Sequence, residues 1–124
     1  MASFQELLGL MRRMRGPDGC PWDREQTLDD FRSHFKNESA EVLQALKRRD
    51  YENLREELGD VLWHVIFMSE IGREKGLFDI EDVIAGLKAK MIRRHPHVFG
   101  GKRLKTSRQV MSEYRRIKAG ERKK

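Results

Sequence analysis

The chain has 124 residues, a formal net charge of +6 at pH 7 and a hydrophobic fraction of 38%. This length suits one domain with a modest core, and we predict a single domain over residues 1–124. No apolar run approaches the roughly 20 residues needed to span a bilayer, so the pattern excludes a membrane protein. The first residues also lack the basic and apolar regions of a secretory signal. A single Cys20 excludes an internal disulfide framework, and we expect a cytoplasmic protein.

Apolar residues recur with helical spacing along the chain, and no segment reads convincingly as a strand. A capping box at Ser3 and Glu6 predicts a first helix over about residues 4–14. The segment Cys20–Asp23 is expected to form a turn or loop in which Trp22 anchors the core. Further helices are expected over about residues 28–48, 51–75, 80–93 and 107–119. The sequence therefore predicts an all-α fold.

The two longest predicted helices are joined by a short polar link near residues 48–51. Helices joined in this way run antiparallel, as in an αα-hairpin. We expect a helical bundle built on this long hairpin. Because the core of a chain this short is modest, we expect homodimerisation to complete the bundle, with a tetramer as an alternative.

Two pairs of carboxylates lie on the predicted hairpin, Glu38 with Glu41 and Glu57 with Asp60. Glu38 and Glu57 each fall within an apolar stripe, where an ionised carboxylate must be paired, protonated or bound to a metal. Four acids meeting from two helices would bind a hard cation such as Mg²⁺ or Mn²⁺. The alternative is that they are ordinary surface carboxylates paired with nearby Lys or Arg residues.

The positive charge is concentrated at the C-terminal end of the sequence. Residues 101–124 hold ten Lys or Arg against two Glu, a formal charge of +8, which leaves −2 for residues 1–100. We interpret the basic helix and tail, about residues 102–124, first as a solvated surface. Binding of nucleic acid is compatible with this charge but is not required by it.

Four motifs occur in order along the chain: Gly19–Thr27 (GCPWDREQT), Glu38–Val42 (ESAEV), Glu56–Asp60 (EELGD) and Arg93–Gly100 (RRHPHVFG). In their residues and spacing they resemble the motifs of the MazG family of nucleoside triphosphate pyrophosphohydrolases. The similarity is in register and extends over about residues 5–119. The resemblance implies the all-α nucleotide pyrophosphatase fold, Mg²⁺ as cofactor, and hydrolysis of an NTP or dNTP to NMP and pyrophosphate. Such an enzyme cleans or regulates nucleotide pools.

The same resemblance implies roles for individual residues. Glu38, Glu41, Glu57 and Asp60 become the catalytic metal ligands, and Asn37 stands where relatives commonly carry another Glu. Cationic and aromatic side chains on the last two helices become the candidates for binding the nucleotide. They are Lys90, Arg93, Arg94 and Tyr114.

Two other functional classes remain open from the sequence. One is a catalytically weak nucleotide-binding or regulatory module whose basic tail binds nucleic acid or a protein partner. The other is a di-iron carboxylate bundle, which ranks last because such bundles use Glu-x-x-His pairs and neither acid pair here has His at that spacing.

Overall fold

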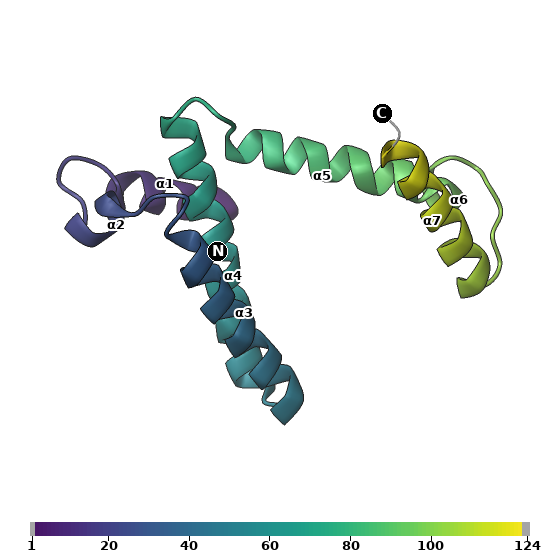
Figure 1. Cartoon of the computed structure of the whole chain (residues 1–124), viewed down its shortest axis with the longest axis horizontal. Helices are drawn as coiled ribbons and strands as arrows, with labels where there is room; N and C mark the ends of the chain where they lie inside the picture. The colour runs from purple at the N-terminus through teal and green to yellow at the C-terminus, as the bar shows by residue number, and fades with distance from the viewer. Residues whose placement is uncertain (1, 123–124) are drawn as a thin grey trace. The chain divides into compact units, whose positions relative to one another are not determined.

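A computed structural model describes residues 2–122, which contain seven helices and no strand (Figure 1). The all-α prediction is therefore confirmed for these residues. The chain divides into two compact units, Met1–Ile80 and Glu81–Lys124, and each is described by itself. The helices are α1 (Phe4–Met14), α2 (Pro21–Glu25), α3 (Phe31–Arg48), α4 (Tyr51–Glu74), α5 (Ile80–Arg94), α6 (Pro96–Phe99) and α7 (Ser107–Arg122). None of them combines the length and apolar character that crossing a membrane requires.

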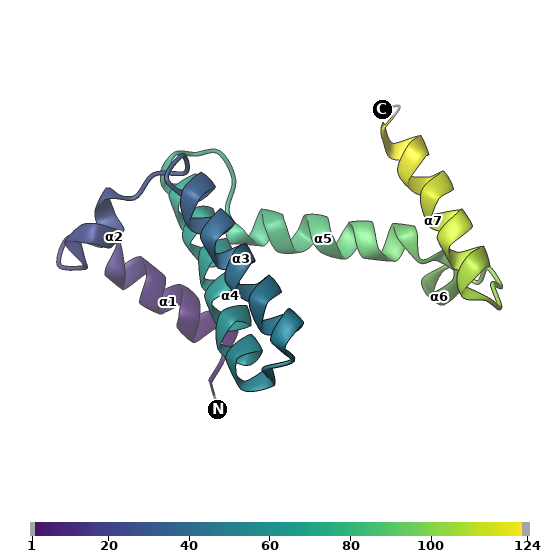
Figure 2. The same cartoon turned by 60° about the horizontal axis from the view of Figure 1, so that its bottom comes forward.

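The first unit is built on the predicted antiparallel hairpin of α3 and α4, which lie side by side in both views (Figures 1 and 2). Only Arg49 and Asp50 separate the two helices. Arg49 adopts the left-handed conformation, with φ of 54°, which ends α3 sharply. The Asp50 side chain then accepts a hydrogen bond from the Asn53 amide at 3.2 Å and caps α4. The chain reverses within two residues, so acids on both helices are brought to one face.

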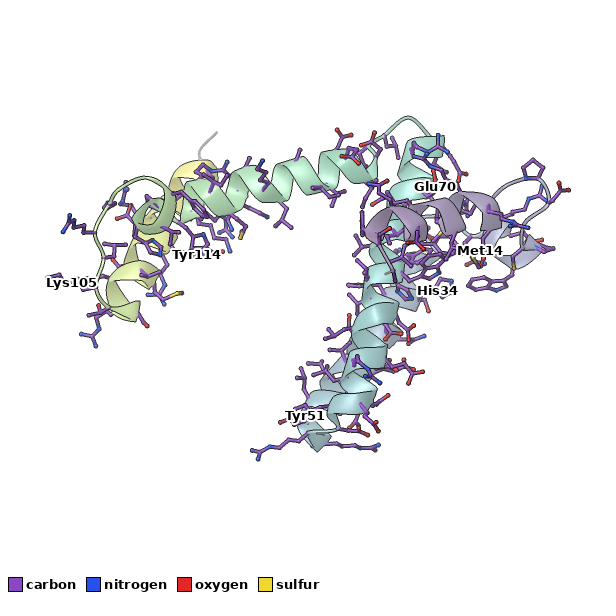
Figure 3. All side chains as sticks on the ribbon, turned by 180° about the vertical axis from the view of Figure 1, so that it is seen from behind. Met14, His34, Tyr51, Glu70, Lys105 and Tyr114 are labelled. Carbon is purple, nitrogen blue, oxygen red and sulfur yellow. The ribbon has the colours of Figure 1, made fainter. Side chains whose placement is uncertain are left out.

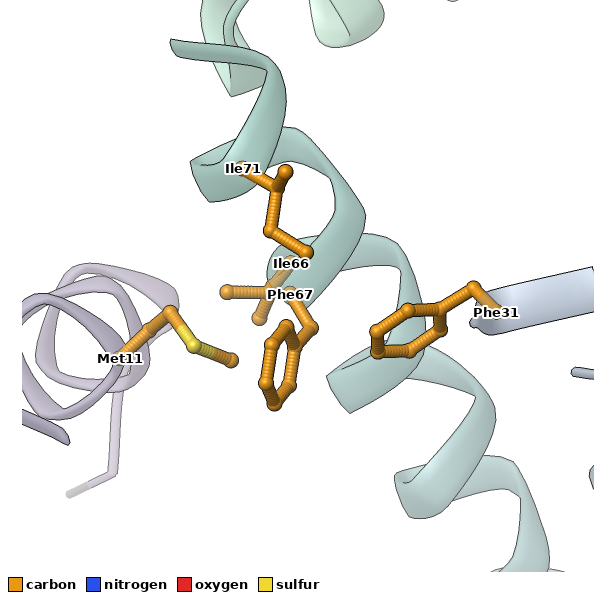
Figure 4. Packing of buried hydrophobic residues seen from close by; sticks show 5 residues of the cluster. All are labelled: Met11, Phe31, Ile66, Phe67 and Ile71. Carbon is orange, nitrogen blue, oxygen red and sulfur yellow. The ribbon is translucent and has the colours of Figure 1, made fainter. Parts of the chain in front are cut away.

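The hydrophobic core of the first unit lies where α1, α3 and α4 meet, at the end of the hairpin remote from the Arg49 turn (Figure 4). Met11 comes from α1 and Phe31 from α3, while α4 contributes the remaining three residues, Ile66, Phe67 and Ile71. All five are buried, and burying a side chain of this size stabilises the fold by roughly 1.5–3 kcal/mol. The core therefore packs against the C-terminal half of α4. The acid pairs lie on the part of the hairpin that is nearer the Arg49 turn.

The link between α1 and α3 differs from the prediction in three respects. Residues 20–23 do not form an open loop, because Pro21 begins the five-residue helix α2. Trp22 is 54% exposed and does not anchor the core. Helix α3 begins at Phe31, a turn later than expected, since Thr27 and Asp30 bond to each other through the Asp30 carboxylate and the Thr27 hydroxyl. These local side-chain bonds hold residues 27–30 in a tight turn before the helix.

Elsewhere the helix ends follow the sequence signals. Ser3 caps α1 by accepting a hydrogen bond from the Glu6 amide at 3.2 Å. Gly76 follows α4 with φ of 69°, as expected for a residue just past a helix end. In the second unit, α5 ends at Arg94 before Pro96, which begins the short helix α6. Helix α7 continues to Arg122, three residues beyond the expected end.

Candidate functional site

Three of the four predicted metal ligands come together on the hairpin. Carboxylate oxygens of Glu38 and Glu41 on α3 and of Glu57 on α4 all lie within 4.8 Å of one another. Glu38 is 8% exposed, Glu57 is half-buried and Glu41 is exposed at the rim. None of the three forms an ion pair with a described residue, so the surface-pair alternative finds no support. We call these three residues the carboxylate cluster.

The carboxylate cluster is electrostatically unfavourable when all its members are ionised. Oε1 of Glu38 and Oε2 of Glu57 are buried and have no hydrogen-bond donor among the described residues. Burial raises the pKa of Glu38, and the charges of Asp60 and Glu41 add to that effect. Hydrogen bonds with Glu38 and Glu41 raise the pKa of Glu57 to about 8. A hydrogen bond between two carboxyl groups requires that one of them keeps its proton. The metal-free cluster therefore holds a shared proton near neutral pH.

Asp60, the fourth predicted ligand, lies outside this 4.8 Å group and is exposed. It is nevertheless close enough for its charge to raise the pKa of Glu38. Sequence spacing placed Asp60 on the same face of α4 as Glu57, one turn further along. Its part in metal binding stays a prediction.

The residues present fit a divalent cation of the Mg²⁺ type. The donors are all carboxylate oxygens, which hard cations prefer over nitrogen or sulfur. Two of these oxygens are buried and find no partner within residues 2–122, and a bound cation would supply the missing counter-charge. A cation would also displace the shared proton, since metal ligands must be deprotonated.

A pocket of about 220 Å³ adjoins the carboxylate cluster in the first unit. Glu38 and Glu41 line it as well, so the pocket and the cluster share two side chains. Asp23 and Asn37 supply its other polar groups. The rest of the lining is aromatic and comprises Trp22, Phe31, His34, Trp63, His64 and Phe67.

The aromatic walls of this pocket contact one another around His34, which is labelled in Figure 3. The centres of the Trp22 and His34 rings are 5.4 Å apart. The Phe31 ring packs edge-on against His34, with 5.2 Å between the ring centres. Nε2 of His34 is 2.7 Å from the Gln26 side-chain oxygen, which fixes the ring. His64 packs edge-on against Phe31 at 5.4 Å, and its buried Nδ1 has no partner among the described residues. Burial lowers the pKa of His64, with the nearby His34 contributing in the same direction.

Sequence reasoning missed two residues of this pocket, Asp23 and His34. Asp23 is 6% exposed, and its Oδ2 has no hydrogen-bond partner among the described residues. The only sequence signal was its place beside Trp22 in the first motif. His34 lies one turn before Glu38 on α3, at a spacing that puts both side chains on the same face.

The guanidinium of Arg15 holds α2, and therefore Asp23, in place. It donates to Glu74 through Nε at 2.7 Å and Nη2 at 3.0 Å, and through Nη1 to the backbone oxygens of Asp23 and Gln26. The guanidinium also lies 5.4 Å from the centre of the Phe67 ring. One side chain thus joins the end of α1, the helix α2 and the end of α4.

We expect Arg15→Met to reduce the free energy of unfolding by about 2–3 kcal/mol, since it removes charge-assisted hydrogen bonds while keeping an apolar stem on Phe67. Denaturant titration measures this change. Arg13→Met is the matched control because Arg13 is exposed. An equal loss of unfolding free energy in the two variants would show that the Arg15 contacts stabilise the fold no more than an exposed arginine does.

The predicted nucleotide-binding residues of the second unit form an ion-pair network of their own. Arg94 donates to Glu121 through Nη2 at 2.8 Å and to the Tyr114 hydroxyl through Nη1 at 2.8 Å. Its guanidinium also lies 5.1 Å from the centre of the Tyr114 ring. Arg93 donates to the same Glu121 carboxylate. Bonds from Arg94 and then Arg93 lower the pKa of Glu121 to about 2. Lys90, the fourth predicted residue, is half-buried on α5.

Residues 26–99 match the model of the MazG nucleotide pyrophosphohydrolase domain. The chain therefore belongs to the MazG domain family, as its motifs predicted. A nucleoside triphosphate pyrophosphohydrolase from Escherichia coli K12 is 42% identical over 123 residues, which are 98% of this chain and 47% of that protein. A Thermotoga maritima protein named nucleoside triphosphate pyrophosphohydrolase/pyrophosphatase MazG is 47% identical over 97 residues, 78% of this chain and 38% of that protein. The chain thus spans about half the length, or less, of these curated relatives.

A solved structure supports the fold. The crystal structure of a mazG-related protein from Thermotoga maritima aligns with a TM-score of 0.76 and 24% sequence identity. The alignment covers 93% of this chain and 98% of that one. The likeness concerns the arrangement of the helices.

Proposed function

We propose that the chain hydrolyses nucleoside triphosphates, NTP or dNTP, between the α and β phosphates and releases NMP and pyrophosphate. The observation that carries this proposal is the carboxylate cluster, whose unpartnered buried oxygens lie beside a pocket lined by aromatic rings. Membership of the MazG family and the names of the curated relatives support it. Such an activity would serve housekeeping or regulation of the nucleotide pool.

Glu38, Glu41, Glu57 and Asp60 are the proposed ligands of Mg²⁺, with Mn²⁺ as an alternative. When bound, the cation neutralises phosphate charge and lowers the pKa of the attacking water. An exposed carboxylate such as Glu41 is suited to orient that water and to accept its proton, because it lies at the rim of the cluster. The attack forms a bond from the water oxygen to the α-phosphorus and breaks the bond to the bridging oxygen, which leaves with pyrophosphate.

Lys90, Arg93 and Arg94 are the proposed phosphate-binding residues, and Tyr114 is a proposed contact of the nucleotide. A triphosphate carries about four negative charges, which guanidinium groups bind with paired hydrogen bonds. In the second unit the Glu121 carboxylate forms ion pairs with both Arg93 and Arg94. A phosphate group would offer these arginines the same kind of negatively charged oxygen atoms. A bound triphosphate would compete with Glu121 for these arginines.

A homodimer is the proposed assembly, with a tetramer as an alternative. Large apolar side chains are exposed on the hairpin and on α5, whereas most apolar residues of a lone helical protein would be covered. They include Leu43, Leu46, Leu58 and Leu62 on the hairpin and Val83, Ile84 and Leu87 on α5. The proposed location is the cytoplasm, where a lone thiol such as Cys20 stays reduced.

Incubating the purified chain with a panel of NTPs and dNTPs and Mg²⁺ tests the proposed activity. Chromatography of the products should show NMP and pyrophosphate in equal amounts, and chelation of the metal should stop their formation. Formation of NDP and phosphate, or no turnover of any nucleotide, would contradict the proposal.

A further inference from the structure

Charged side chains connect α7 to the segments that precede it in the second unit. None of the described residues of α7 is buried. Near the middle of the helix, Glu113 accepts a hydrogen bond from Lys102 at 2.6 Å. Near its end, the Glu121 carboxylate forms ion pairs with Arg93 and Arg94, the last two residues of α5. Because ion pairs near the surface exchange with other ions, an anion can undo the attachment of the C-terminal half of α7.

The contact at Glu121 places one carboxylate between two guanidinium groups. Oε1 of Glu121 accepts hydrogen bonds from Nε and Nη2 of Arg94 at 3.2 and 2.8 Å, and Oε2 accepts one from Arg93. Arg94 is 12% exposed, so its charge needs an anion beside it. Glu121 is 22% exposed and Arg93 is 50% exposed, so solvent reaches the contact. An incoming anion can therefore replace Glu121 without leaving Arg94 unpaired.

Tyr114 takes part in the same contact. It lies about two turns before Glu121 on α7, which puts both side chains on one face of the helix. Its hydroxyl accepts a hydrogen bond from Nη1 of Arg94 at 2.8 Å, and Figure 3 labels this side chain. Arg94 thus directs Nε, Nη1 and Nη2 at α7. These are the groups with which a guanidinium binds the oxygens of a phosphate.

We propose that Glu121 is an autoinhibitory anion, which holds α7 on the two arginines until a polyphosphate displaces it and releases the C-terminal end of α7. The inference rests on the proposed function, in which Arg93 and Arg94 bind phosphate groups, and deepens it by naming a residue that controls access to them. Bonds from Arg94 and then Arg93 lower the pKa of Glu121 to about 2, so the carboxylate is ionised at neutral pH. The exchange therefore replaces one anion by another and moves no proton.

A contact of this kind weakens the binding of phosphate. When the arginines are free in only a fraction of the molecules, the apparent Kd is the intrinsic Kd divided by that fraction. Removing Glu121 should therefore tighten the binding of phosphates. Removing a residue that positions the arginines, or that only docks α7, would weaken binding or leave it unchanged. The direction of the change distinguishes an inhibitory role from a structural one.

Isothermal titration calorimetry with inorganic pyrophosphate, in the absence of Mg²⁺, measures this affinity without hydrolysis. We expect Glu121→Gln to bind pyrophosphate about tenfold more tightly than the wild type, because a neutral amide competes poorly for guanidinium groups. Glu81→Gln is the matched control, since Glu81 is exposed on α5 and the substitution changes the net charge equally. The control should bind within about twofold of the wild type. Circular dichroism establishes that each variant is folded.

The variant Arg94→Met tests whether Glu121 acts through the arginines. It removes the guanidinium that bonds to both Glu121 and Tyr114. We expect this variant to bind pyrophosphate weakly, and adding Glu121→Gln to it should tighten binding by about threefold at most, since Arg93 alone remains. A full tenfold gain in the Arg94→Met chain would show that the charge of Glu121 acts without Arg94, and it would overturn the proposal.

Amide hydrogen exchange of α7 tests the release of this helix in the wild-type chain, so it decides the matter even if a variant does not fold. A helix of 16 residues is only marginally stable in water without tertiary contacts. Saturating pyrophosphate should therefore speed exchange in the last turns of α7 by about threefold or more, although bound ligands usually slow exchange. Folded Glu121→Gln should show the faster exchange without any ligand.

Unchanged or weaker binding of pyrophosphate by folded Glu121→Gln would overturn the proposal, as would unchanged or slower exchange of α7 in the wild type with pyrophosphate. Failure of both chains to bind pyrophosphate would also overturn it. These outcomes are separate from failure of the proposed hydrolysis. A chain that cleaves NTPs but gains no affinity in Glu121→Gln keeps its reaction and loses the inhibitory contact. Tighter binding in Glu121→Gln without turnover of any nucleotide would mean the reverse.

Discussion

Replacing Glu57 with Gln is expected to reduce NTP hydrolysis by about 100-fold or more while leaving the helical fold intact. Glu57 is the member of the carboxylate cluster that α4 contributes, so its loss leaves ligands from α3 alone within the 4.8 Å group. An amide is neutral and compensates the charge of a cation poorly. Initial rates at saturating Mg²⁺ measure the effect, and circular dichroism measures the fold.

Glu56→Gln is the matched control because the same change is made one residue away, at an exposed side chain outside the cluster. We expect this variant to retain activity close to that of the wild type. Retention of activity by Glu57→Gln, or equal loss in both variants, would show that the metal site has been assigned to the wrong residues.

The metal-free protein is expected to lose stability as the pH rises from about 4.5 to about 8, and Mg²⁺ is expected to restore it. The folded-state pKa of Glu57 is raised from 4.5 to about 8, so in this window the folded chain binds more protons than the unfolded chain. Stability falls with pH under that condition. Because Mg²⁺ displaces the proton, it binds more tightly as pH rises, and a concentration 100 times its Kd adds about 2.7 kcal/mol.

Thermal unfolding with and without Mg²⁺ at several pH values measures both trends. His64 has the opposite effect at pH values below 6.5, its ordinary pKa, where its contribution to stability increases as the pH rises. The reason is that burial lowers the pKa of His64, so protonation of this side chain opposes folding. The difference between wild type and Glu57→Gln isolates the carboxylate, since both chains keep His64. The raised pKa of Glu57 would be contradicted if the difference in Tm between the metal-free wild type and metal-free Glu57→Gln did not change with pH.

The fold was predictable where short-range signals act alone. Ser3 and Gly76 are side-chain and backbone signals that mark helix ends without help from tertiary contacts, and both were placed correctly. Helix α2 escaped prediction because five residues are too short to show a hydrophobic period. The start of α3 was predicted too early because Leu28 extends the apolar period into a turn that Thr27 and Asp30 hold together.

The candidate site was predictable in part for a similar reason. Glu38 and Glu57 interrupt apolar stripes, and that local conflict between charge and burial can be read from spacing. The position of Asp23 beside the same site depends on α2 and on the contacts of Arg15, which join segments distant in sequence. Periodicity carries no information about such contacts. Trp22 was expected to anchor the core, whereas it is 54% exposed and lines the pocket.

The proposed reaction is cleavage of NTPs by attack of water on the α-phosphorus beside the carboxylate cluster. Hydrolysis in water labelled with oxygen-18, followed by mass spectrometry of the products, tests this reaction. We expect NMP and pyrophosphate in equal amounts, with the label in NMP and with both products lost in Glu57→Gln. Label in pyrophosphate, formation of NDP and phosphate, or no turnover of any nucleotide would contradict it.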